Sequence, residues 1–200
     1  MLFRSPLKQI PHFEAEVVEA CNTNGVNDVF EFMEAMDPSE NPNYGQLVKA
    51  MGLSNAQLGD AARFTNERYP NVELNFELED PENVTSGAPS VLNVSVEREI
   101  EEDEEPNLTV HAPFYPAEKT ENWWLVVGEE STKSLLAIKR VTIARALKTK
   151  LELVVPTPGK HELTLFLMSA DYVGVDQAPT FGVDAAEGME EDEDEDDDDE

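Results

Sequence analysis

Two segments in the second half of the chain carry apolar residues at both odd and even positions. They span 122–128, with the sequence Asn-Trp-Trp-Leu-Val-Val-Gly, and 163–168, with the sequence Leu-Thr-Leu-Phe-Leu-Met. Successive side chains of a β-strand point to opposite faces, so a strand that is apolar at both parities needs cover on both faces. One cover is the core of the protein, and the other must be a neighbouring domain or a partner. The pattern therefore predicts a docking surface.

Before residue 70 the apolar positions follow the spacing of helices. An apolar stripe interrupted at Gly25 predicts a helix over about 12–22, with Pro11 at its start. The pattern resumes over 26–36, then in a short helix near 47–51, and then behind a capping box that begins at Ser54. A helical unit of ~65 residues buries only about 60% of its chain surface, so we expect it to pack against a neighbour.

From residue 71 onward the spacing of apolar residues changes to two. The segment 72–78 alternates strictly between apolar and polar residues, which predicts a strand with one wet face. Further strands are predicted at 91–97, 108–112, 122–128, 134–143, 147–155, 161–169 and 180–184. These strands, with turn signals between them, favour an antiparallel immunoglobulin-like or fibronectin type III-like sandwich. The expected fold is α + β, with a helical domain at 1–70, a β-sandwich at 71–186 and a disordered acidic tail at 187–200.

The charge of the chain limits the partners that we expect. The net charge is -29, and Glu187 with the acidic run 190–200 contributes 12 of the negative charges, so residues 1–186 carry -29 + 12 = -17. Such a surface repels phosphate backbones and favours basic partners, so direct RNA contact is expected to be minor. The single cysteine, Cys21, cannot form an internal disulfide, and no apolar run approaches the ~20 residues of a membrane span. The sequence predicts a soluble chain in a reducing compartment.

No motif in the sequence predicts catalysis, a cofactor or a metal. There is no glycine-rich phosphate loop, no nucleophile elbow and no set of His or Cys residues at metal-ligand spacing. We therefore assign no catalytic, cofactor-binding or metal-binding residues. The acidic tail is interpreted as a solubilising segment, or alternatively as a ligand for a basic partner or a mimic of RNA.

The two doubly apolar strands provide the candidate partner-binding residues. If Leu163, Leu165 and Leu167 fill the core, Phe166 and Met168 point outward on the same strand. If Trp123 and its alternate neighbours also point inward, Trp124 and Val126 join the outward face. We expect the two strands to pair as neighbours. The alternative is that the helical domain covers this face within the protein.

One concentration of basic residues interrupts the acidic sequence. Its members lie on two successive predicted strands: Lys139, Arg140, Arg145, Lys148 and Lys150. If these strands pair as a hairpin, they form a positive stripe. Three interpretations stay open: a solvated edge that discourages strand aggregation, a site for a partner, or a cradle for the acidic tail of the same chain.

Several ordered segments of the chain resemble a known family. They are 5–13 (Ser-Pro-Leu-Lys-Gln-Ile-Pro-His-Phe), 62–64 (Ala-Arg-Phe) with 69–71 (Tyr-Pro-Asn), 122–124 (Asn-Trp-Trp) with 127–128 (Val-Gly), 136–140 (Leu-Ala-Ile-Lys-Arg) and 168–177 (Met-Ser-Ala-Asp-Tyr-Val-Gly-Val-Asp-Gln). Together they resemble the Sec-sixty-three homology module. Within that superfamily they are most similar to the module at the end of the large spliceosomal DExH helicases of the U-five particle, which unwind the U-four/U-six RNA duplex.

The resemblance implies a fold and a function. It implies a helix-loop-helix domain followed by a fibronectin-like or immunoglobulin-like domain, in a fragment cut from a longer nuclear protein. It implies a monomeric protein-interaction and regulatory platform in pre-mRNA splicing, with splicing-factor proteins and the rest of the helicase as partners. ATP and magnesium belong to the motor domains of the full-length helicase, so the fragment itself is expected to be non-enzymatic.

Two other classes of protein share part of the pattern. The protein-translocation subunit of the endoplasmic reticulum carries the same module, but it resembles the chain less at 63–64 and 69–71. Acidic-tailed histone chaperones combine an immunoglobulin-like sandwich with an acidic segment, but they leave the preceding helical domain unexplained.

Overall fold

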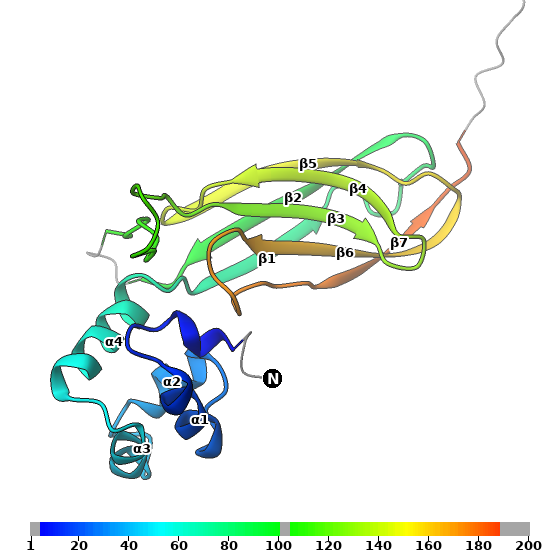
Figure 1. The fold of residues 1–200 in the computed structure, drawn as a ribbon. Coiled ribbons are helices and arrows are strands. Elements are labelled where there is room, and N and C mark those ends of the chain that lie inside the picture. The colour runs from blue at the N-terminus through cyan, green and yellow to red at the C-terminus, as the bar shows by residue number, and fades with distance from the viewer. Residues whose placement is uncertain (1–4, 101–104, 189–200) are drawn as a thin grey trace, which may run out of the picture.

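The helices of the protein gather at one end of a two-sheet sandwich. The computed structural model describes residues 5–100 and 105–188. The described helices are a 3-10 turn η2 (Pro6–Gln9), α1 (Ala15–Thr23), α2 (Val29–Ala35), α3 (Tyr44–Met51) and α4 (Asn55–Glu67). Figure 1 shows them clustered beside the end of the sandwich rather than over either sheet.

Local capping interactions explain where the helices begin and end. Ser54 and Gln57 form the predicted capping box at the start of α4. Gly52 ends α3 in the left-handed conformation, where a residue with a Cβ would be strained. The first helix begins at Ala15 and not near residue 12, because His12 has a φ of 69° and turns the chain out of helical geometry. Phe13 precedes the helix but is still buried, with its ring edge-to-face on Phe32.

The described strands form two antiparallel sheets. They are β1 (Val72–Leu78), β2 (Pro89–Arg98), β3 (Trp123–Glu129), β4 (Ser134–Val141), β5 (Ala146–Val154), β6 (Gly159–Ser169) and β7 (Thr180–Ala185). The three-stranded sheet has the order β1-β2-β5, and the four-stranded sheet has the order β4-β3-β6-β7. The two layers face each other in Figure 1. The helical-plus-sandwich architecture predicted from the change of period is therefore confirmed.

Three details differ from the sequence-based expectation. Residues 108–112 form no strand and make a single bridge, between Thr109 and Thr120, because this segment hydrogen-bonds locally to the chain that returns at 119–121. The strand expected to run to residue 143 ends at Val141. The expected hairpin of β4 with β5 is wrong, since β4 pairs with β3 and β5 pairs with β2. Of the predicted tail 187–200, residues 189–200 lie outside the described residues, as does part of the acidic loop at 101–104.

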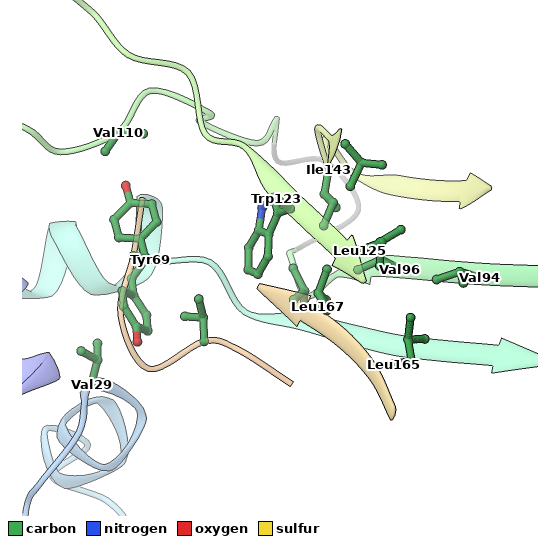
Figure 2. Close-up of a cluster of buried hydrophobic side chains, with 14 of the residues drawn as sticks. Val29, Tyr69, Val94, Val96, Val110, Trp123, Leu125, Ile143, Leu165 and Leu167 are labelled. Atoms are coloured by element: carbon green, nitrogen blue, oxygen red, sulfur yellow. The ribbon is translucent and has the colours of Figure 1, made fainter. Parts of the chain in front are cut away.

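The core lies between the inner faces of the sheets and continues toward the helices. Figure 2 shows Trp123 and Leu167 at the end of the sheets that faces the helices, and Tyr69 between these strands and Val29 of α2. Trp123 is fully buried and its indole Nε1 donates to Glu121, which also accepts from Arg98. The ion pair of Arg98 with Glu121 is thus enclosed in this part of the core, with side-chain exposures of 6% and 2%.

The helices contact the sandwich through the loop that joins β6 to β7. The Tyr69 hydroxyl donates to the carbonyl of Val173 at 2.9 Å, and the side chain of Gln9 exchanges two hydrogen bonds of 2.8 Å with the backbone of the same residue. Gly174 has a φ of 92°, and a Cβ there would lie 3.1 Å from the Tyr69 hydroxyl. The loop therefore approaches the helices closely because residue 174 lacks a side chain.

Candidate functional site

The alternation of β3 and β6 separates a buried face from an outer face. Trp123, Leu125 and Val127 on β3 have no solvent exposure, and neither do Leu163, Leu165 and Leu167 on β6. Their neighbours in sequence point to the other face of the four-stranded sheet. The structure thus directs all four candidate residues, Trp124, Val126, Phe166 and Met168, away from the core.

Strand register places these four residues in two adjacent rows across the sheet. Trp124 stands opposite Met168 of β6, and Val126 stands opposite Phe166, so the predicted pairing of the two strands is confirmed. On the other side of β3, Trp124 faces Arg140 and Val126 faces Ile138. Cross-strand neighbours of this kind have Cβ atoms about 5 Å apart, so the side chains form one continuous surface. We call Trp124, Val126, Ile138, Phe166 and Met168 the outer apolar face.

The outer apolar face is open to solvent in this chain. Trp124 is 36% exposed and Ile138 is 56% exposed, while Val126, Phe166 and Met168 are half-buried among one another. The Arg140 guanidinium lies 5.8 Å from the centre of the Trp124 ring, so a cation covers part of the largest aromatic surface. The face therefore combines an apolar centre with a positively charged border.

The helices do not cover this face. Their recorded contacts with the sandwich lie at its end, where Tyr69 bonds to Val173, Arg68 bonds to Thr109 and Phe64 packs on His111. Figure 1 agrees, with the helices beyond the ends of β3 and β6. The alternative that the helical domain covers the face within the protein is therefore wrong for the described residues.

The predicted basic residues lie along one side of the sandwich, although not on a hairpin. Lys139 reaches from β4 across the gap between the sheets, and its Nζ donates to Thr149 Oγ1 at 2.7 Å and to the Lys150 carbonyl at 3.3 Å, both on β5. Lys148 and Lys150 project from β5, and Arg145 lies in the connection before it. We call Lys139, Arg140, Arg145, Lys148 and Lys150 the basic side. It adjoins the outer apolar face because Arg140 belongs to both borders.

One ion pair anchors the basic side to the neighbouring loop. Lys150 Nζ lies 2.6 Å from Glu79 Oε1. The hydrogen bond from Lys150, followed by one from Asn93, holds the pKa of the Glu79 carboxyl below its ordinary value. This pair is exposed, so its contribution to stability is small.

The sequence analysis missed two exposed apolar residues of β4. Ile138 and Leu135 are 56% and 61% exposed. The run Leu135-Leu136-Ala137-Ile138 is apolar at both parities, the same signal that identified β3 and β6. A register shift between Val127 and Gly128 complicates the alternation, because Leu135 pairs with Gly128 while Ala137 pairs with Val127.

The sequence analysis also missed a groove between the helices and the segment that precedes β3. This groove of about 1120 Å³ is lined by 8–14, by parts of α4 and by 109–118. Phe114 at its rim is fully exposed, and Tyr115 is 56% exposed. Burial, and after it the nearby charge of Arg68, lowers the pKa of His111 in the groove. The Pro-Phe-Tyr-Pro sequence at 113–116 was a detectable signal, since two aromatic residues between prolines cannot enter a strand interior.

The titratable and ligating groups give no sign of a reactive centre in the described parts of the chain. Within 5–100 and 105–188, no three His, Cys, Asp or Glu side chains cluster in a way that would hold a metal ion. Cys21 is buried, and burial raises its pKa to about 11, so the thiol is unreactive. None of the described helices has the length and apolar character needed to cross a membrane.

Comparison with known proteins relates almost the whole chain to one family. The Sec63 Brl domain model matches residues 8–182. The pre-mRNA-splicing factor brr2 of Schizosaccharomyces pombe is 42% identical over 186 residues, which are 93% of this chain and 8% of that protein. The U5 small nuclear ribonucleoprotein 200 kDa helicase of Homo sapiens is 42% identical over 183 residues, 92% of this chain and 8% of that protein. The DExH-box ATP-dependent RNA helicase DExH13 of Arabidopsis thaliana is 38% identical over 193 residues, 94% of this chain and 9% of that protein. The chain thus spans under a tenth of the length of these curated relatives.

Proposed function

Because this chain belongs to the Sec63 Brl domain family, we propose that it serves as a non-catalytic, protein-binding module of a spliceosomal RNA helicase. The names of the matched relatives describe splicing factors and ATP-dependent RNA helicases. In this proposal the motor domains of the full-length protein hold ATP and magnesium and unwind RNA. The module binds and positions splicing proteins in the nucleus, as a monomer, and regulates the motor.

The outer apolar face is the observation that carries this proposal. Five apolar side chains on three adjacent strands form one surface, and the largest of them, Trp124, is 36% exposed. A contiguous apolar surface with a polar border is typical of protein-interaction sites. Tryptophan and arginine are enriched among the residues that dominate binding energy, and the Arg140 guanidinium lies over the Trp124 ring here.

The sheet order supports a fibronectin type III-like form of the sandwich. In the constant type of immunoglobulin domain, the fourth strand joins the sheet of the first two strands. Here β4 joins β3, and the resulting sheets have three and four strands. With the helices before it, this arrangement supports the division into a helix-loop-helix domain and a fibronectin-like domain.

The charge of the module favours protein rather than RNA as the main ligand. Residues 1–186 carry -17, and the one basic concentration lies at the border of the apolar face rather than in a groove lined with aromatic residues. Extended contact with a phosphate backbone requires several cations that face the same path. We therefore assign RNA contact a minor part in the function of this chain.

Substitutions on the two sheets test the proposal directly. The wild-type chain and the variants Phe166→Glu and Trp124→Ala are each immobilised and incubated with nuclear extract. The proteins that each one retains are then measured by quantitative mass spectrometry. Truncating an aromatic anchor typically removes about 2 kcal/mol or more, so Trp124→Ala should weaken retention of splicing proteins about 30-fold. Val154→Glu is the matched control, because Val154 is 41% exposed and projects from the opposite sheet.

Thermal melts separate a lost surface from a lost fold. We expect Phe166→Glu to lose splicing proteins at an unchanged melting temperature, while Val154→Glu retains them. Equal retention by all variants would show that another surface binds, and the groove beside Phe114 would be the next to test. Retention of translocon proteins or histones in place of splicing proteins would contradict the functional assignment itself.

A further inference from the structure

The basic side is a concentration of positive charge at the edge of the sandwich where β4 and β5 lie side by side. Six of the 14 lysines and arginines of the chain fall within 131–151, a stretch without aspartate or glutamate, and Glu152 follows directly on the outward face of β5. Two strands from different sheets bring them together, since Lys139 of β4 bonds to β5. Within the described parts of the chain, one of the four cations Lys139, Arg140, Lys148 and Lys150 forms an ion pair: Lys150 pairs with Glu79.

The same chain contains a segment of the opposite charge. Residues 190–200 are all aspartate or glutamate, which gives 11 negative charges in 11 consecutive positions. An anionic segment and a cationic surface attract each other whether they lie on two molecules or on one. When both are on one molecule, the tether converts binding into an intramolecular event with an effective concentration in the mM range.

The last described residues hold the start of this segment near the end of β5. The Ala186 amide donates to the Val84 carbonyl at 2.8 Å, and the Gly188 amide donates to Ser86 Oγ at 3.1 Å. The next residue of that loop, Gly87, donates to the carbonyl of Val155 at 2.9 Å, directly after β5. The acidic segment therefore begins beside the loop 84–87, and this loop is hydrogen-bonded to the end of the strand that carries Lys148 and Lys150.

The length of the segment matches the distance that it must cover. A strand rises about 3.3 Å per residue, so Lys150 lies about 17 Å and Lys148 about 23 Å from Val155 along β5. The 12 residues after Gly188 span up to about 40 Å when extended. Lys148 and Lys150 are two residues apart on one face of β5, and alternate carboxylates of an extended acidic chain repeat at the same interval.

We propose that residues 189–200 bind back along the basic side, with their carboxylates on Lys148, Lys150 and Lys139. The acidic segment then shields this side from phosphate backbones and from acidic proteins, and an added anionic ligand must displace it. Lys148 and Lys150 project from the other sheet than Trp124 and Arg140, so the bound segment leaves the outer apolar face uncovered. This proposal does not depend on which proteins the apolar face binds.

Paramagnetic relaxation measured on the full chain tests the proposal. A nitroxide is attached to Glu195→Cys, and the buried native Cys21, whose pKa is raised to about 11, stays unlabelled. We expect the amide signals of β5 near Lys148 and Lys150, and of β4 near Lys139, to lose more than half of their intensity. The same label should leave α3, in the helical cluster beyond the end of the sandwich, unaffected. Since the Debye length falls to about 3 Å at 1 M salt, the broadening should disappear in ~1 M NaCl.

Charge-neutralising variants distinguish a specific contact from general attraction. Lys148→Gln with Lys150→Gln should abolish the broadening, while the matched pair Lys49→Gln with Lys160→Gln, two exposed lysines elsewhere, should preserve it. The proposal would be overturned if the broadening were spread evenly over the surface. It would also be overturned if the two double variants showed equal broadening. An absence of broadening together with binding of a short single-stranded RNA at the basic side would overturn it too, and would assign that side to a nucleic acid.

Discussion

Arg98 gives the sharpest test of how the two sheets are held together near the helices. Its Nη2 donates to Glu121 at 2.5 Å and to the Ile143 carbonyl at 3.1 Å, and its Nε donates to the Ala144 carbonyl at 3.1 Å. The substitution Arg98→Met removes all three bonds and leaves a carboxylate with 2% side-chain exposure without its cation. Breaking a buried pair in this way typically costs about 3–5 kcal/mol of unfolding free energy.

The assay is denaturant unfolding followed by tryptophan fluorescence, with thermal melts in parallel. A loss of about 3–5 kcal/mol corresponds to a melting temperature lower by roughly 6–20 °C for a chain of this size. Arg140→Met is the matched control, because Arg140 is exposed and such surface changes stay within about 0.5 kcal/mol. The double variant Arg98→Met with Glu121→Gln should recover more than about 1 kcal/mol, since the uncompensated charge is gone.

The pH dependence provides a second, independent check. Burial raises the pKa of Glu121, and the charge of Arg98 opposes that rise. Without Arg98 the pKa rises further, so the folded variant binds a proton that the unfolded chain releases at lower pH. A raised carboxyl pKa gives stability that is present below the unfolded pKa and is lost as pH rises through the folded pKa. The penalty of Arg98→Met should therefore be larger at pH 8 than near pH 4; a penalty below 1 kcal/mol, or one independent of pH, would refute this reasoning.

Three further predictions concern the helices, the junction and catalysis. Ser54→Ala removes the capping box of α4 and should lower the unfolding free energy by about 1 kcal/mol. Ser39→Ala, outside the helices, should change the unfolding free energy far less. Equal effects of the two substitutions would contradict the role of the cap. Gly174→Ala places a Cβ 3.1 Å from the Tyr69 hydroxyl at a φ of 92°, so NMR relaxation should detect looser tumbling of the helices relative to the strands, and unchanged correlation times would argue against a junction at this loop. The isolated chain should release no phosphate from ATP, and turnover that persists through rigorous purification would exclude the non-catalytic assignment.

Local sequence determined most of the elements of this protein and the orientation of the side chains on β3 and β6. The capping box at Ser54 and the change of period at residue 71 depend on neighbours within a few positions, so they appear in the sequence and again in the structure. The outward direction of Trp124 and Phe166 followed in the same way, because strand alternation is a local property once one parity is buried. The Sec63 resemblance rested on such short ordered motifs, and the family match confirms it.

Tertiary structure alone decided how these elements meet. Sequential strands often pair, as β3 and β4 do, yet β5 crosses to β2 instead of pairing with β4. This arrangement brought Lys139 to β5 across the gap between the sheets instead of along a hairpin, and it placed Ile138 beside Val126. The pairing of Arg98 with Glu121 joins residues 23 positions apart. No local period records such distant contacts, because they arise only when the chain closes around its core.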